Sequence, residues 1–125
     1  MQNLSGTWRI AAPQSEGNPE AFTALHTFFA DGNWSEINSF RDVNRGVWAP
    51  AGSSHLLVFE GYTFDAEGRC SGSLQVRATV ELLDDDHLAA RWEQDMFDLQ
   101  GRVTKRAYHG TFTGTRMVVE HAAVS

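Results

Sequence analysis

At 125 residues the chain has the size of a single domain, and it is long enough to bury a core without disulfides or metals. Hydrophobic residues make up 42% of the sequence and aromatic residues 11%, which excludes a disordered chain. The formal net charge of −6 comes without any basic block, so we expect neither nucleic acid nor a membrane surface as a partner. We therefore expect residues 1–125 to form one domain.

The sequence also bears on the cellular compartment. No apolar run is long enough to span a membrane, and the first residues lack the basic-then-apolar pattern of a signal peptide. We therefore expect a cytoplasmic protein. Cys70 is the single cysteine, and neither histidine nor lysine adjoins it, so we expect a buried and unreactive side chain.

The first half of the chain alternates strand and turn signals. Residues 7–12 predict a first strand, and residues 13–20 predict a polar loop in which Asn18 and Pro19 could begin a short helix. The elements expected after this loop are a hairpin of residues 22–29 and 33–40, a loop at 41–44, a short strand at 46–48 and a turn at 49–54.

Three turns share one chemistry, because each is a three-residue loop that ends in glycine: residues 30–32, 66–68 and 99–101. Such a loop is a type I turn followed by a left-handed residue, and glycine adopts that positive φ without steric cost. Counting outward from each loop predicts the cross-strand partners. The first loop places Phe28 opposite Trp34, His26 opposite Glu36 and Ala24 opposite Asn38.

The same counting predicts one continuous interior for the long strands that begin at Leu56. The second loop places Glu60 opposite Leu74, and the third places Trp92 opposite Tyr108. The acidic turn at 84–86 gives the same inward positions on the strands that it joins, and a one-residue slip would destroy this agreement. The predicted interior is Leu56, Val58, Glu60, Tyr62, Phe64, Leu74, Val76, Ala78, Val80, Ala90, Trp92, Gln94, Met96, Arg106, Tyr108 and Phe112.

Together these elements predict an all-β fold. We expect a single antiparallel up-and-down β-barrel of about eight strands, joined in chain order by short connections. A barrel of this size has room for its own side chains and one small ligand in its lumen, the space that the strands enclose. We expect a monomer or a homodimer.

Two short motifs frame the chain. Gly6-Thr7-Trp8 lies on the first predicted strand, and Arg116 follows the last one in Thr113-Gly114-Thr115-Arg116. With the strand order, these motifs resemble the lipocalin-like proteins of the calycin group, which carry Gly-x-Trp on the first strand and a basic residue over that tryptophan. The resemblance implies that Trp8 and Arg116 close one end of the barrel. Because the chain is shorter than secreted lipocalins and has no cysteine pair, it fits a small lipocalin-like barrel rather than an extracellular transport protein.

The polar members of the predicted interior bear most directly on function. Among them is Glu60, and removing a carboxylate from water costs several kcal/mol unless it is paired. Three explanations of Glu60 stay open: an ion pair with Arg106, a position near a wet barrel mouth, and a ligand-facing acid or general base.

His26 and Glu36 form a second candidate site. Because the first loop opposes them directly, they could act as an oriented acid/base pair. Both faces of this hairpin carry aromatic residues, so the sequence leaves open whether the pair faces the lumen or solvent.

Two classes of function fit these residues. The first is binding of a small, mostly apolar or aromatic molecule in the lumen. The second is a cofactor-independent isomerase, dehydratase or cyclase, in which Glu60 or His26 moves a proton with the hydroxyl of Tyr62 as partner. The expected ligand-binding residues are Trp92, Gln94, Met96, Arg106, Tyr108, Phe64, Val58, Trp34 and Glu36.

Other chemistries have less support. The five histidines lack the spacing of a metal site, so we expect neither a metal nor another cofactor. The resemblance to lipocalin-like barrels, some of which bind haem through one histidine, adds a haem-binding barrel as a further alternative. The remaining alternative is a lumen filled by the protein's own side chains.

Overall fold

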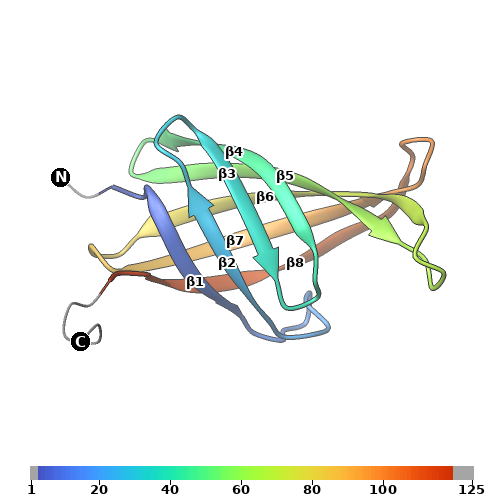
Figure 1. Cartoon of the computed structure of the whole chain (residues 1–125), viewed down its shortest axis with the longest axis horizontal. Helices are drawn as coiled ribbons and strands as arrows, with labels where there is room; N and C mark the ends of the chain where they lie inside the picture. The colour runs from blue at the N-terminus through green and yellow to red at the C-terminus, as the bar shows by residue number, and fades with distance from the viewer. Residues whose placement is uncertain (1–2, 120–125) are drawn as a thin grey trace.

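The computed structural model describes residues 3–119, except for the side chains of residues 106 and 107, and shows a closed barrel of eight antiparallel strands in chain order (Figure 1). The prediction of an all-β up-and-down barrel is confirmed. No helix among the described residues is long and apolar enough to cross a membrane. The strands are β1 (Gly6–Ala12), β2 (Phe22–Phe28), β3 (Asn33–Asn38), β4 (Val43–Ala51), β5 (Ser54–Phe64), β6 (Cys70–Leu82), β7 (His87–Phe97) and β8 (Val103–Arg116).

The barrel closes where β1 pairs with β8. Trp8 lies opposite Arg116 in this ladder, its indole is fully buried, and the guanidinium carbon lies 4.3 Å from the ring centroid. The same guanidinium donates hydrogen bonds of 2.6 Å to the carbonyl oxygens of Asn3 and Ser5. The predicted contact that closes one end of the barrel is therefore confirmed.

The glycine-ended loops form the predicted turns. Gly32, Gly68 and Gly101 have φ angles of 93°, 79° and 80°, which other residues adopt only with strain. Beyond the first loop the predicted partners are confirmed, with His26 opposite Glu36. The register across the acidic turn between β6 and β7 is confirmed as well.

The predicted inward face of β5 is wrong. The β5–β6 ladder shifts by one residue between Thr63 and Phe64, so that Gly61 rather than Glu60 lies opposite Leu74. Because side chains alternate along a strand, this shift turns the whole of β5 over and buries Leu57 and Phe59. The residues that were expected inside and lie outside are Leu56, Val58, Glu60, Tyr62 and Phe64.

The β7–β8 ladder also departs from the predicted count. Irregularities beside Met96 place Gly110, instead of Tyr108, opposite Trp92, and Tyr108 opposite Gln94. A displacement of two positions preserves the face of each side chain, so Trp92, Gln94 and Tyr108 still point into the lumen. The absence of a side chain at Gly110 leaves room for the indole, whose nearest atom lies 3.0 Å from where a Cβ would stand.

Three local predictions are corrected by the structure. Residues 41–44 were expected to form a loop, but Val43 and Asn44 pair with β3 and make β4 longer than predicted. No helix begins at Asn18, because it forms a backbone bridge with Ser15 and its side chain donates to the carbonyl of Pro13. Cys70 is exposed, because it lies at the start of β6.

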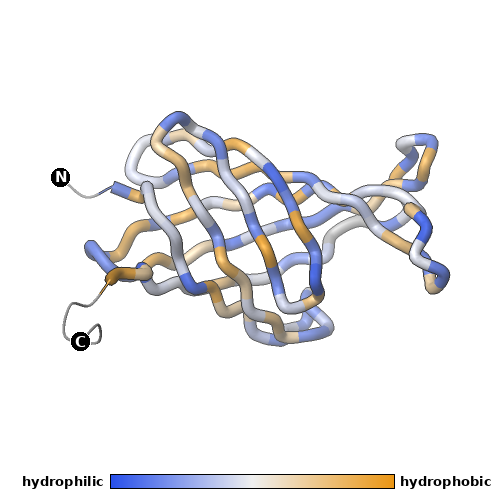
Figure 2. Tube along the Cα trace, in the orientation of Figure 1, coloured by the Kyte–Doolittle hydropathy of each residue, from blue (hydrophilic) through white to orange (hydrophobic). Residues whose placement is uncertain are grey.

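The two ends of the barrel differ. At the end where β1 begins and β8 ends, large side chains such as Trp8, Phe28 and Trp34 are almost fully buried. At the other end the β5–β6 and β7–β8 hairpins project beyond the remaining strands (Figure 1), and their turns are largely hydrophilic (Figure 2). The β1–β2 and β3–β4 loops lie at this second end, so we call it the open end.

Candidate functional site

A cavity of about 200 Å³ occupies the lumen toward the open end. All eight strands contribute to its lining, together with the β1–β2 and β3–β4 loops. In another protein, an engineered apolar cavity of about 150 Å³ binds benzene. The cavity is thus large enough for one ring with short substituents. Its aromatic lining residues are Phe22, Phe40, Phe59, Trp92, Tyr108 and Phe112.

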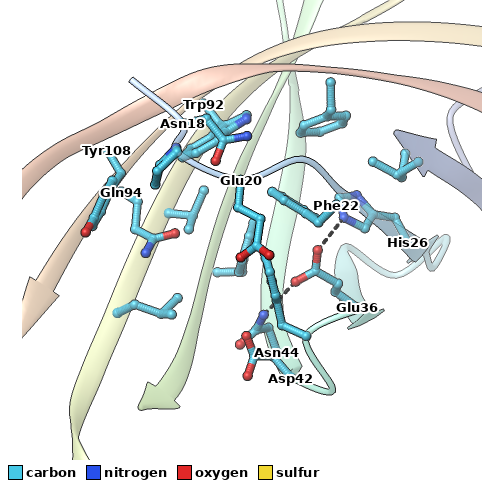
Figure 3. Close-up of a pocket in the computed structure, with 17 residues that line it drawn as sticks. Asn18, Glu20, Phe22, His26, Glu36, Asp42, Asn44, Trp92, Gln94 and Tyr108 are labelled. Carbon is cyan, nitrogen blue, oxygen red and sulfur yellow. Dashed lines mark hydrogen bonds and ion pairs between the residues drawn. The ribbon is translucent and has the colours of Figure 1, made fainter. Parts of the chain in front are cut away.

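His26 and Glu36 face this cavity as a buried, hydrogen-bonded pair (Figure 3). Their side chains are 2% and 4% exposed, and Nε2 of His26 lies 2.8 Å from Oε2 of Glu36. An ionised carboxylate can only accept, so Nε2 of His26 donates this hydrogen bond to Glu36. The sequence left the orientation of this pair open, and the structure shows that it faces the lumen.

Aromatic rings hold the imidazole of His26 in place. Its centroid lies 4.8 Å from that of Trp34 and 5.2 Å from that of Phe112, both in edge-to-face geometry. Nδ1 of His26 is buried and has no hydrogen-bond partner among the described residues. The ring is therefore fixed, and one of its two nitrogens is uncommitted.

The second oxygen of Glu36 is held by two asparagines. Asn44, directly opposite on β4, donates from Nδ2 to Oε1 at 2.5 Å, and Asn38 donates to the same oxygen at 3.3 Å. These bonds replace water around a buried carboxylate. Asn44 has room only because Gly61 on β5 lacks a side chain, since a Cβ there would overlap Oδ1 of Asn44.

Further acidic groups stand around the cavity. Glu20 and Asp42 both line it, and Figure 3 shows the carboxylate of Glu20 reaching into it from the β1–β2 loop. Burial raises the pKa of Asp42 above its ordinary value, and the negative charge of Glu36 raises this pKa further. A hydrogen bond with the side chain of Asn38 partly opposes the shift.

The β1–β2 loop is anchored on β8. The backbone N–H of His109 donates to the carbonyl of Gly17 at 3.0 Å, and a Cβ at Gly17 would meet the imidazole of His109 at 2.5 Å. This contact positions Asn18 and Glu20 at the cavity.

The structure brings together only part of the site predicted from the sequence. The predicted residues that line the cavity are His26, Glu36, Trp92, Gln94 and Tyr108. Trp34 lies behind His26, against its ring, and Met96 lies farther along β7 and does not line the cavity.

The remaining predicted residues are elsewhere. Glu60, Tyr62, Val58 and Phe64 lie outside the barrel because of the shift in β5, and Glu60 accepts a hydrogen bond from Gln75 at 3.2 Å. The side chain of Arg106 lies outside the described part of the chain. The buried position expected for Glu60 is therefore wrong, and with it the proposed lumen pairing with Arg106.

Several residues of the site were not predicted from the sequence. Asn44 was assigned to a loop, although counting onward from Glu36 across a tight β3–β4 turn would have placed it opposite Glu36. Asp42 does lie in the β3–β4 connection, but its place at the cavity was not predicted. Phe59 was assigned to the wrong face of β5. No local signal marked Glu20, whose position depends on how the β1–β2 loop folds over the barrel.

No protein-family model matches the chain, and comparison with the curated proteins finds no match either. The assignment that can be made is therefore one of fold. The chain is an all-β, closed, eight-stranded antiparallel barrel that is compatible with a lipocalin-like fold.

Proposed function

We propose that this barrel is a lipocalin-like protein that binds a small, largely aromatic molecule in its lumen. The observation that carries the proposal is the cavity of about 200 Å³, which has aromatic and aliphatic walls and a fixed polar pair, His26 and Glu36. Binding sites for small molecules combine apolar walls with a few fixed polar groups in this way. The expected ligand is a one-ring or small two-ring compound with one hydrogen-bonding group.

Filling the cavity tests this proposal. Val76 lines the cavity and Val58, on the neighbouring strand, points outward, so Val76→Phe and Val58→Phe make the same change on opposite faces of the barrel wall. A panel of one-ring and two-ring compounds is screened by thermal shift, and hits are measured by calorimetry.

We expect Val76→Phe to abolish binding and Val58→Phe to retain it. Near-ultraviolet circular dichroism checks that each variant is folded, and Leu74→Phe, also at the cavity, replaces Val76→Phe if that variant does not fold. Equal binding by the lumen and surface variants, or a panel without any hit, would contradict the proposal.

A second candidate function is acid/base catalysis by an isomerase, dehydratase or cyclase. The observation that favours it is the carboxylate of Glu36, which faces the cavity and is oriented by hydrogen bonds from His26 and Asn44. A carboxylate held within reach of a bound compound can act as a general acid or base. In this mechanism Glu36 would move the proton and His26 would be a positioning residue, because Nε2 of His26 is bound to Glu36 and Nδ1 is buried.

The test of this second candidate compares Glu36→Gln with Glu60→Gln, which removes a carboxylate on the outside of the barrel. Turnover of a bound compound should fall far more than its affinity in Glu36→Gln, and Glu60→Gln should change neither. Unchanged turnover in Glu36→Gln would exclude this mechanism.

Haem fits the site poorly. A tetrapyrrole is far larger than the single ring for which a cavity of about 200 Å³ has room, and Nε2 of His26 already donates to Glu36. No step of either proposed function uses such a group.

A further inference from the structure

The charged groups around the cavity have one sign, and this bears on the ligand if the proposed binding function holds. Three carboxylates line the cavity, those of Glu20, Glu36 and Asp42, and no described lining residue is lysine or arginine. Among the described residues they do not gather into a group that could hold a metal ion.

These carboxylates are not equally neutralised. Glu36 accepts hydrogen bonds from His26 and two asparagines. By contrast, Asp42 and Glu20 form no ion pair with any residue in the described part of the chain. Burial raises the pKa of Asp42, and repulsion by the nearby charge of Glu36 raises this pKa further. A bound cation would relieve this repulsion.

The aromatic walls favour the same kind of ligand. The ring of Phe22 lies 5.2 Å from that of Phe40 and 6.5 Å from that of Trp92, so several ring faces and edges converge beside the acidic groups. Ammonium groups are attracted to the faces of aromatic rings, most strongly to tryptophan. Carboxylates next to aromatic faces therefore suit an organic cation better than a neutral or anionic molecule.

We infer that the ligand is a cationic amine, an ammonium group attached by a short chain to one ring. Its ammonium lies among Glu20, Glu36 and Asp42, and its apolar body lies against Phe22 and Trp92. The cavity volume of about 200 Å³ limits the body to about one ring. Molecules that carry a carboxylate or phosphate are repelled.

Three probes of nearly equal shape test the inference: 2-phenylethylamine, 2-phenylethanol and 3-phenylpropionate. Their affinities are measured by isothermal titration calorimetry at pH 7 and low salt. The amine should bind about ten-fold or more tightly than the alcohol, and the propionate should not bind measurably. An alcohol or propionate that binds as tightly as the amine would overturn the inference and leave the proposed lumen site standing.

Matched variants locate the charge effect. Asp42→Asn removes a carboxylate at the cavity, and Asp85→Asn makes the same change in an exposed turn at the closed end. Asp42→Asn should weaken amine binding about ten-fold and leave alcohol binding unchanged, whereas Asp85→Asn should alter neither. Glu20→Gln, in an exposed loop, is the second cavity variant should Asp42→Asn fold poorly.

Other outcomes are decisive as well. Equal loss of amine binding in Asp42→Asn and Asp85→Asn would mean a non-specific effect of net charge and would overturn the inference. If none of the three probes binds, the inference fails. The proposed function itself then fails only if the wider panel of ring compounds also gives no binding.

Discussion

Gly61 supports the candidate site without touching a ligand. It lies on the inner face of β5 beside Asn44, and a Cβ at this position would overlap Oδ1 of Asn44. In Gly61→Ala the Asn44 side chain must therefore move, and its hydrogen bond to the buried carboxylate of Glu36 breaks. The variant adds one methyl group, yet it should disrupt the whole network.

The size of this effect follows from the two interactions involved. A hydrogen bond to a charged group contributes about 1.5–3 kcal/mol, and forcing an extra methyl into a packed interior costs about 1–3 kcal/mol. We therefore expect Gly61→Ala to lower the free energy of unfolding by about 3–5 kcal/mol. Asn44→Ala loses the same bond without the overlap and should lower it by about 2 kcal/mol.

The double variant separates this account from a general intolerance of alanine at position 61. With Asn44 truncated, the overlapping atom is gone, so Gly61→Ala should cost less than about 1 kcal/mol in that background. Urea unfolding of the four proteins, followed by tryptophan fluorescence, gives the free energies from the midpoints and slopes. Equal costs of Gly61→Ala in both backgrounds would refute the reasoning.

Two further predictions concern Arg116 at the closed end of the barrel and Asp42 at the cavity. Arg116→Met removes the cation over Trp8 and should lower the free energy of unfolding, measured in urea, by about 2 kcal/mol. Ligand affinity should not change, because the cavity is at the other end of the barrel, and a loss of affinity would contradict this prediction. Because the pKa of Asp42 is raised in the folded state, its contribution to stability is fully present below its ordinary value of 3.8 and is lost as the pH rises through the raised value. Asp42→Asn should therefore melt at a higher temperature than the wild type at pH 7, and the difference should vanish below pH 3.8; a constant difference across this range would be inconsistent with the raised pKa.

The first hairpin shows how far turn chemistry alone can predict a site. The loop at 30–32 fixed the register without any irregularity, and counting outward from it brought His26 opposite Glu36. Counting outward from the loop could not show which face of the hairpin points into the lumen, because aromatic residues occupy both faces. The closed barrel and the packing of His26 against Trp34 decide that question.

β5 shows why the rest of the site could not be predicted. Four consecutive residues, 56–59, are all apolar, so alternation fits either face equally well. The deciding feature is the irregularity between Thr63 and Phe64, which has no local sequence signal. It leaves Leu56 exposed and turns Glu60 to the outside, which overturns the site that seemed strongest in the sequence.

The β3–β4 connection explains why Asn44 was missed. The segment 41–44 has the composition of a loop, yet Asn44 pairs with Glu36 and completes the hydrogen bonds of its carboxylate. The hydrogen bond from Asn44 stabilises the buried carboxylate of Glu36. The local sequence does not show that Glu36 is buried, because its burial depends on closure of the barrel. Long-range closure, rather than local propensity, thus determines which polar residues form the site.

The most direct test of the account is a crystal structure of the protein with the tightest-binding compound of the panel. We predict that the ring lies in the lumen against Phe22 and Trp92, with its polar group within hydrogen-bonding distance of Glu36 or Asp42. A ligand bound on the outer surface, with the lumen closed by the protein's own side chains, would contradict it.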